Sequence, residues 1–120
     1  MDKDISLLSD LLKRKDRFTY DLRSQCQVYE GIVCAYRATP ELEHFSELTF
    51  VIAHAKAYDG IVGAWRDPLT REVRYDSCRI FTDLGNAMRF ARAQRQRSVY
   101  DLYRNSEVWL TEQANASMRP

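Results

Sequence analysis

Arginine dominates one stretch of the chain, "RFARAQRQRSVYDLYRN" at residues 89–105, in which Asp101 is the only acid. On a helix, Arg89, Arg92 and Arg95 would form a basic edge beside an apolar face. Guanidinium groups bind phosphate and carboxylate through paired N–H donors, so this edge is a candidate contact for nucleic acid, an acidic partner or a phosphate-containing ligand. The competing interpretation is a solvated helix face, because the sequence pI is about 7.7 and nucleic-acid-binding domains commonly exceed about 9.

Tyr-Asp pairs are a second candidate for chemistry. A tyrosine hydroxyl beside a carboxylate can contribute to a polar ligand-binding cluster when several pairs converge. The pairs are Tyr20-Asp21, Tyr58-Asp59, Tyr75-Asp76 and Tyr100-Asp101. We single out Tyr75, Asp76, Tyr100 and Asp101 because they fall in expected strands, where an aspartate must face solvent, pair with an arginine or line a site. Trp65 is a further candidate, because it lies on an expected strand of a sheet whose face away from the helices is open to a partner. The alternative is that each tyrosine ends an apolar run and each aspartate opens a turn.

Metal, nucleophile and phosphate-loop patterns are missing from the sequence. His44 and His54 are ten residues apart, which is not the spacing of a metal-binding pair on a helix. The three cysteines form no CxxC motif, and we expect Cys26, Cys34 and Cys78 to be buried thiols. The four glycines form no phosphate-binding motif. We therefore predict no catalytic residue, no metal and no cofactor, and a protein that is not an enzyme.

Size and composition predict an ordinary globular protein. The chain has 120 residues, of which 45% are hydrophobic and 29% charged, typical of one domain. We place that domain at residues 1–111 and a flexible tail at 112–120. No apolar run reaches the roughly 18 residues that span a bilayer, and the N-terminus carries acids where a signal peptide carries basic residues. We expect a cytoplasmic protein with no membrane partner.

Helical spacing and capping signals predict the elements of the first half. Residues 4–15 have the spacing of a short amphipathic helix, and residues 16–26 show no clean period and are assigned to a connection. Residues 27–37 form an expected strand in which Gly31 indicates a bulge or a close approach. Thr39-Pro40-Glu41 begins a helix that should end at Asp59-Gly60.

The second half predicts two hairpins around a helix. Residues 61–66 and 72–81 should pair across a turn, Thr82-Asp83 should cap the next helix, and residues 98–103 and 107–111 should form the second hairpin. The order is α-β-α-β-β-α-β-β. This predicts an α+β fold with an antiparallel sheet and helices on one face, in which a ferredoxin-like (split βαβ) core is possible. No internal repeat indicates a larger architecture.

Three quoted segments carry a resemblance: "GAWRDPLTREVRYDS", "IFTDLGNAMRFARAQRQ" and "SVYDLYRNSEVWL". In this order they resemble small uncharacterised α+β proteins of phages and mobile elements, over residues 60–110. The resemblance implies a related fold and a mobile-element origin. It brings no assigned activity and no catalytic residue.

Together these patterns favour a small non-enzymatic binding or accessory protein, acting through a protein contact or as a homodimer. Aromatic and arginine side chains, which are enriched at interfaces, are plentiful. One alternative is a nucleic-acid-binding protein that uses the arginine edge with Tyr100 or Tyr103; its arginines are Arg89, Arg92, Arg95, Arg97 and Arg104. Another is capture of a phosphate-like or nucleotide-like small ligand by a Tyr/Asp/Arg pocket.

Overall fold

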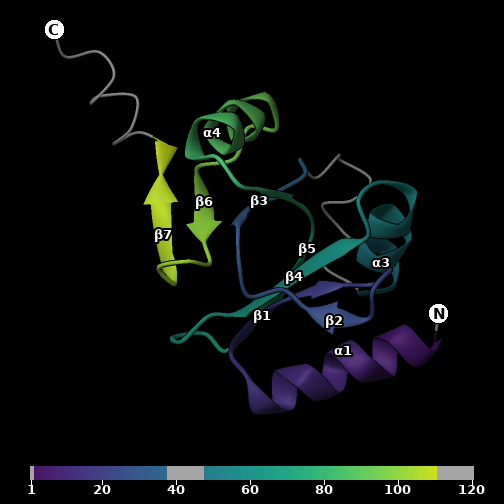
Figure 1. The fold of residues 1–120 in the computed structure, drawn as a ribbon. Coiled ribbons are helices and arrows are strands. Elements are labelled where there is room, and N and C mark those ends of the chain that lie inside the picture. The colour runs from purple at the N-terminus through teal and green to yellow at the C-terminus, as the bar shows by residue number, and fades with distance from the viewer. Residues whose placement is uncertain (1, 38–47, 111–120) are drawn as a thin grey trace, which may run out of the picture. The chain divides into compact units, whose positions relative to one another are not determined.

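The computed structural model of the protein describes residues 2–37 and 48–110 (Figure 1). Over these residues it contains three helices and an antiparallel sheet of seven strands, in the order β2-β1-β4-β5-β3-β6-β7. The predicted α+β class is confirmed. The succession β3-α3-β4-β5-α4-β6 follows the split βαβ order, and a ferredoxin-like core stays a prediction.

Contacts along the chain divide it into two compact units. Unit 1 comprises Met1–Val28 and Ala38–Cys78, and unit 2 comprises Tyr29–Arg37 and Arg79–Pro120. Strand β5 (Val73–Phe81) contributes residues to both units. The assignment of residues 1–111 to a single domain stays a prediction.

Unit 1 packs two helices on a small antiparallel sheet. Helix α1 (Asp2–Arg14) and helix α3 (Leu48–Ala57) lie with strands β1 (Arg17–Asp21), β2 (Cys26–Gln27) and β4 (Ile61–Arg66). Their shared core contains Leu8 and Leu12 of α1, Ile52 of α3 and Val62 of β4. Both helices therefore cover the same face of β1 and β4, because alternate residues of a strand point to opposite faces.

Strands β1 and β2 correct the sequence analysis, which assigned residues 16–26 to a connection. Residues 17–21 alternate polar and apolar side chains as a strand does, but the run is only five residues long, and Phe18, Thr19 and Tyr20 are all buried. Strand β2 has only two residues. The predicted helix at 4–15 and the predicted hairpin at 61–81 are confirmed.

Helix α3 ends where its sequence predicts. The Gly60 N–H donates to the carbonyl of Ala55 over 2.6 Å, and Gly60 has φ +79°, a left-handed conformation that favours glycine at a helix end. Residues 48–57 lie in the predicted helix and are helical. The predicted start at Thr39-Pro40-Glu41 lies outside the described residues.

Unit 2 packs one helix on the other strands of the sheet. Strand β3 (Ile32–Ala35) pairs with β6 (Ser98–Asp101), which pairs with β7 (Ser106–Trp109). Helix α4 (Leu84–Ala93) begins at the predicted cap, where the Asp83 carboxylate accepts from the Asn86 N–H over 2.9 Å. Ala87, Met88 and Ala91 of α4 pack on Ile32 and Cys34. The strand predicted at 27–37 is shorter than expected, and the tail at 112–120 lies outside the described residues.

The close approach predicted at Gly31 is confirmed, since the side chain of Ile80 lies against its backbone. Gly31 has φ +113°, and a Cβ at this position would lie 2.5 Å from Cγ2 of Ile80. Among the cysteines, Cys34 and Cys78 are buried as predicted, whereas Cys26 is exposed and corrects that prediction. No helix within residues 2–37 and 48–110 is long and apolar enough to span a membrane.

Candidate functional site

Seven basic residues of unit 1 lie at the ends of neighbouring elements. The basic run that ends α1 continues to the first residue of β1, and β1 pairs with β4, which leads into the β4–β5 hairpin. We call this cluster the basic end of unit 1; it consists of Lys13, Arg14, Lys15, Arg17, Arg66, Arg71 and Arg74. Segments 13–17 and 66–74 contain three acids, Asp16, Asp67 and Glu72, so their formal charge is +4 (seven minus three).

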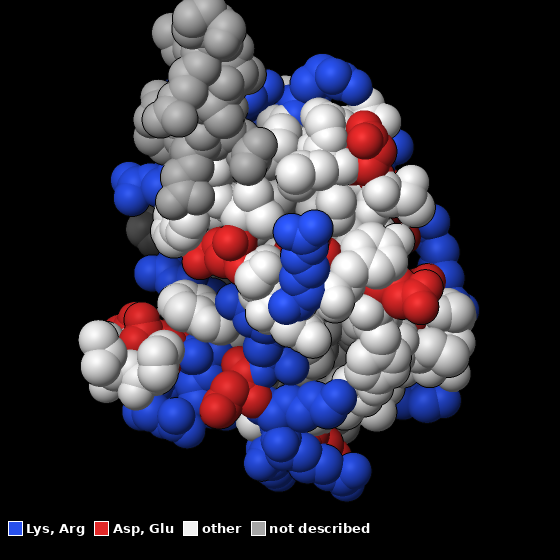
Figure 2. Space-filling view, turned by 60° about the vertical axis from the view of Figure 1, so that its left-hand side comes forward, with Lys and Arg blue, Asp and Glu red and all other residues white. Residues whose placement is uncertain are grey.

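Most of these side chains reach water. All except the half-buried Arg66 are exposed. Figure 2 shows Lys and Arg side chains crowded along the lower edge of that view, the level at which Figure 1 draws α1 and the β4–β5 hairpin. The chain as a whole carries a net charge of only +1, so its positive charge is concentrated locally.

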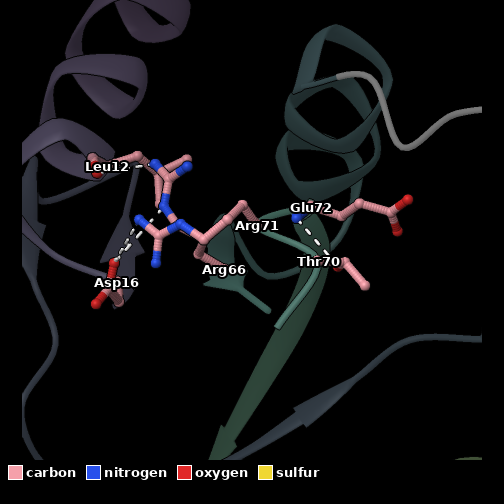
Figure 3. Close-up of polar contacts among 6 residues, drawn as sticks. All are labelled: Leu12, Asp16, Arg66, Thr70, Arg71 and Glu72. Carbon is pink, nitrogen blue, oxygen red and sulfur yellow. Dashed lines mark hydrogen bonds and ion pairs between the residues drawn. The ribbon is translucent and has the colours of Figure 1, made fainter. Parts of the chain in front are cut away.

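Arg66 holds the end of α1 against the hairpin (Figure 3). Its Nη2 donates to the Leu12 carbonyl over 3.1 Å, and its Nε lies 3.6 Å from Asp16 Oδ1. Nη2 of Arg71 lies 3.9 Å from the same carboxylate oxygen. A cation suits the last carbonyls of a helix, because they carry the negative end of the helix dipole. Arg66 therefore positions the cluster, while the exposed cations around it remain in contact with solvent.

Trp65 lies between two arginines on the sheet. The register places Arg17 opposite Trp65 on β1 and Arg74 opposite Trp65 on β5. The half-buried indole and the two guanidinium groups share one face of the sheet, the face opposite α1 and α3. An aromatic ring flanked by arginines offers stacking together with phosphate contacts.

Asp76 occupies the next position on that face. It pairs in register with Gly63, which has no side chain to separate Asp76 from its neighbours. Packing around the carboxyl group raises the pKa of Asp76, and the guanidinium groups of Arg74 and Arg17 oppose that rise. The residue keeps an exposed surface, so contact with water limits the desolvation.

The hairpin tip is ordered by Asp67. Its carboxylate accepts from the N–H groups of Leu69 and Thr70, over 2.8 and 3.1 Å, and these bonds lower the pKa of Asp67. The turn presents Leu69 with 91% of its surface exposed. The tip is therefore an apolar projection beside the basic residues.

The arginine edge expected on one helix is divided in the structure. Arg89 and Arg92 lie on α4, and Arg89 donates to the side chain of Asn86. The helix ends at Ala93, so Arg95, with φ +56°, lies beyond it in the left-handed conformation and does not extend the helical edge. All three side chains are exposed.

Tyr75 and Asp76 point to opposite faces of β5, so they do not form one cluster, whereas Trp65 and Asp76 share a face. Asp101 opens the β6–β7 turn by accepting from the N–H groups of Tyr103 and Arg104, and Tyr100 lies beside it on β6. Asp101 therefore has the turn role that the sequence offered as its alternative. The small-ligand pocket stays a prediction.

His54 and Ser77 form a pair that the sequence analysis did not consider. Nδ1 of His54 lies 2.7 Å from the Ser77 hydroxyl, and the imidazole stacks on Tyr58 at 4.3 Å between ring centroids. Burial lowers the pKa of His54. Ser77 is 8% exposed beneath α3, so this pair ties the helix to the sheet, and a substrate has little access to the hydroxyl.

Acid and thiol clusters of metal-binding type are not found in the part of the chain that the structure describes: no group of three or more His, Cys, Asp or Glu side chains could hold a metal ion. The arrangement that unit 1 presents is an exposed basic surface. It joins residues 13–17 to residues 66–74 through pairing of β1 with β4. This surface was not predicted from the sequence, because residues 16–26 were assigned to a connection and not to a strand.

Comparisons with known proteins do not name a relative. No protein-family model, no curated protein and no solved structure matches the chain. The resemblance to phage and mobile-element proteins stays a prediction, and the function rests on the geometry.

Proposed function

We propose that this protein is a non-enzymatic binding protein whose partner is nucleic acid, contacted through phosphate groups at the basic end of unit 1. The observation that supports the proposal is the gathering of seven cations from α1, β1 and the β4–β5 hairpin at one end of unit 1, where two of them, Arg17 and Arg74, flank Trp65. Phosphate contacts by Lys and Arg supply most of the sequence-independent affinity for nucleic acids. The sequence predicted a nucleic-acid contact at the arginine edge of α4, whereas the contact proposed here lies at the basic end of unit 1.

Nucleic acid fits this surface better than an acidic protein does. Arg17 and Arg74 flank the indole of Trp65, which pairs a stacking surface for a base with donors for the phosphates on either side. An acidic protein would supply carboxylates to the cations, whereas a nucleic acid supplies a phosphate and a planar base with every nucleotide. Contacts to phosphate without reading of base edges predict weak dependence on sequence.

The test measures binding of labelled single-stranded and duplex oligonucleotides by fluorescence anisotropy over a range of salt concentrations. If about five phosphates are contacted, the slope of log K against log salt is about −4. The variant R14Q/R17Q/R74Q removes three exposed cations, and its slope should become shallower by about 2 to 3. The matched control, K3Q/K56Q/R104Q, removes the same charge elsewhere and should bind like the parent protein.

Three results contradict the proposal. They are no binding of any oligonucleotide at low salt, equal weakening by both triple variants, and binding of anionic vesicles without binding of nucleic acid. Circular dichroism of each variant establishes that the fold is retained before binding is compared.

A second candidate is a protein contact or homodimer through the β6–β7 hairpin, as the sequence analysis expected. Trp109 is 45% exposed and Tyr103 is 55% exposed, and among the described strands β7 pairs with β6 alone. Exposed aromatic side chains at a strand edge favour association. Sedimentation equilibrium should give a dimer mass for the parent protein and a monomer mass for Trp109→Ser. A parent protein that is monomeric at about 100 µM would contradict it.

A further inference from the structure

The two units contain the same hairpin. Residues 17–29, "RFTYDLRSQCQVY", align with residues 97–109, "RSVYDLYRNSEVW", and share the pattern R-x-x-Y-D-L-x-x-x-x-x-V. The registers agree as well, because Tyr20 pairs with Gln27 as Tyr100 pairs with Glu107. The sequence analysis reported no internal repeat, and the strand pairing corrects it.

The turns of the two hairpins have the same geometry. Asp21 Oδ1 accepts from the N–H groups two and three residues later, over 2.9 and 3.3 Å, and Asp101 Oδ1 accepts from its equivalents over 2.9 and 3.3 Å. The last turn residue has a positive φ in both, +58° at Gln25 and +51° at Asn105. This correspondence includes backbone conformation as well as residue type.

The strand beside each hairpin is duplicated too. Residues 31–37 are "GIVCAYR" and residues 60–66 are "GIVGAWR", identical at five of seven positions. Tyr20 pairs with Val62 of the second copy, and Tyr100 pairs with Val33 of the first. The residue after each Tyr-Asp pair donates its N–H to the glycine that precedes the strand, over 2.8 Å in both units. Each unit therefore contains one copy of a three-stranded sheet.

The helices do not belong to the duplicated part. Helix α4 packs on Ile32 and Cys34 of β3, whereas α1 and α3 pack on Val62 and Ala64 of β4. In the alignment of the two strands these are opposite faces. Only the sheet and the residues at its end can be compared between the units.

The end of the sheet in unit 2 repeats the chemistry of the basic end of unit 1. Arg97 precedes β6 and Tyr36 follows β3, and the two alignments match them with Arg17 and Trp65. Both aromatic residues are half-buried, and each is followed by an arginine, Arg37 or Arg66. An arginine and an aromatic residue therefore occupy matching positions in the two copies.

The link from α4 to β6 adds further cations at this place. Gln94 Oε1 accepts from the Arg37 N–H over 2.7 Å, and Gln96 Nε2 donates to the Tyr36 carbonyl over 3.2 Å. These contacts bring the link against the end of β3. We call the cluster the basic end of unit 2; it consists of Arg37, Arg92, Arg95 and Arg97, all exposed. Residues 36–37 and 92–97 contain no acid.

From this correspondence we infer that the chain carries two copies of one nucleic-acid contact, one at the basic end of each unit. The inference rests on the proposed function and deepens it, since it sets the number of sites. Each copy supplies an arginine and an aromatic residue at matching positions, and additional cations from the link that precedes the hairpin. Each copy takes the phosphates and a base of its own short strand segment.

The experiment counts how many short strands one protein molecule binds. The probe is an oligothymidylate of about eight nucleotides, within the range of a single small site, and native mass spectrometry with titration calorimetry gives the stoichiometry at low salt. The parent protein should bind two strands. The unit 1 variant R14Q/R17Q/R74Q and the unit 2 variant R37Q/R95Q/R97Q should each bind one, and their combination none.

Variants that keep the charge distinguish a loss of binding from a loss of fold. R37K/R95K/R97K retains the three charges and should bind two strands with affinity reduced less than tenfold. K3Q/K56Q/R104Q should also bind two. The duplicated contact is overturned if the parent protein binds a single strand that the unit 2 variant leaves unchanged, a result that would leave the proposed function standing. Failure of the parent protein to bind any strand overturns both.

Discussion

The imidazole of His54 links α3 to β5 through its hydrogen bond to Ser77. Burial lowers its pKa below the ordinary 6.5, because a charged imidazole would lose hydration where the ring packs between α3 and β5. In the unfolded chain the ring takes up its proton at the ordinary pKa. The unfolded state therefore binds more protons than the folded state below about pH 7.

This difference predicts acid-sensitive stability. The contribution of neutral His54 is complete above its unfolded pKa and decreases as the pH falls through 6.5 toward the lower folded pKa. Urea denaturation of the parent protein should give a free energy of unfolding that declines from pH 7.5 to 5.5, and His54→Gln should flatten this decline. His44→Gln removes the other histidine and is the control. An equal effect of both variants would contradict the assignment.

Gly31 offers a second test at the scale of one residue. A methyl group at this position would lie 2.5 Å from Ile80 Cγ2, and φ is +113°. Gly31→Ala should therefore lower the free energy of unfolding by more than about 2 kcal/mol. Gly85→Ala, in α4, should change it by less than about 1 kcal/mol, because alanine favours a helix. Equal effects in thermal denaturation would contradict the close approach.

Elements with local signals were the ones predicted from the sequence. The amphipathic spacing of α1, the Asp83 cap of α4 and the glycine that ends α3 all act within a few residues. The β1–β2 hairpin was missed because β1 has only five residues and β2 only two, too few for a clear period. The basic end of unit 1 was missed for the same reason, since β1 brings its two segments together. Pairing between strands that are far apart in the chain leaves no pattern within a short stretch of sequence.

The duplicated turns predict matched effects on stability. Gln25→Gly and Asn105→Gly should each stabilise the protein, because glycine adopts a positive φ without strain. The gain should be larger at Gln25, by about 0.5 kcal/mol, because asparagine already tolerates this conformation better than glutamine does. Chemical denaturation measures both variants. A larger gain at Asn105 would show that the two turns are not equivalent.

Over the whole molecule the positive and negative charges nearly cancel, but they are unevenly distributed. The net charge is +1 and the sequence pI is about 7.7, yet segments 13–17 and 66–74 carry +4 (seven cations minus three acids). A charged surface responds to the local cluster and much less to distant charges, because salt screens interactions beyond about 10 Å. The pI therefore understates the affinity of this chain for polyanions.

Chromatography should display this asymmetry. Near pH 7.7, at which the sequence is neutral overall, the protein should still be retained on a heparin or cation-exchange column at low salt. R14Q/R17Q/R74Q should elute at lower salt than K3Q/K56Q/R104Q, although both carry the same net charge. Identical elution of the two variants would show that retention follows the net charge alone.

The near identity of β3 and β4 has a consequence for how the chain refolds. Val33 is thirteen residues from Tyr20 and Val62 is forty-two, so closing the shorter loop, which pairs β1 with β3, is favoured by about 1 kcal/mol of chain entropy. The native fold must therefore disfavour pairing of β1 with β3. Gly63 contributes to this preference, because a Cβ at its position would lie 3.1 Å from Cys78 Sγ. The side chain of Cys34, which aligns with Gly63, would not fit in that space. Stopped-flow refolding should accordingly show a slow phase in which mispaired strands separate, and Gly63→Cys should enlarge its amplitude.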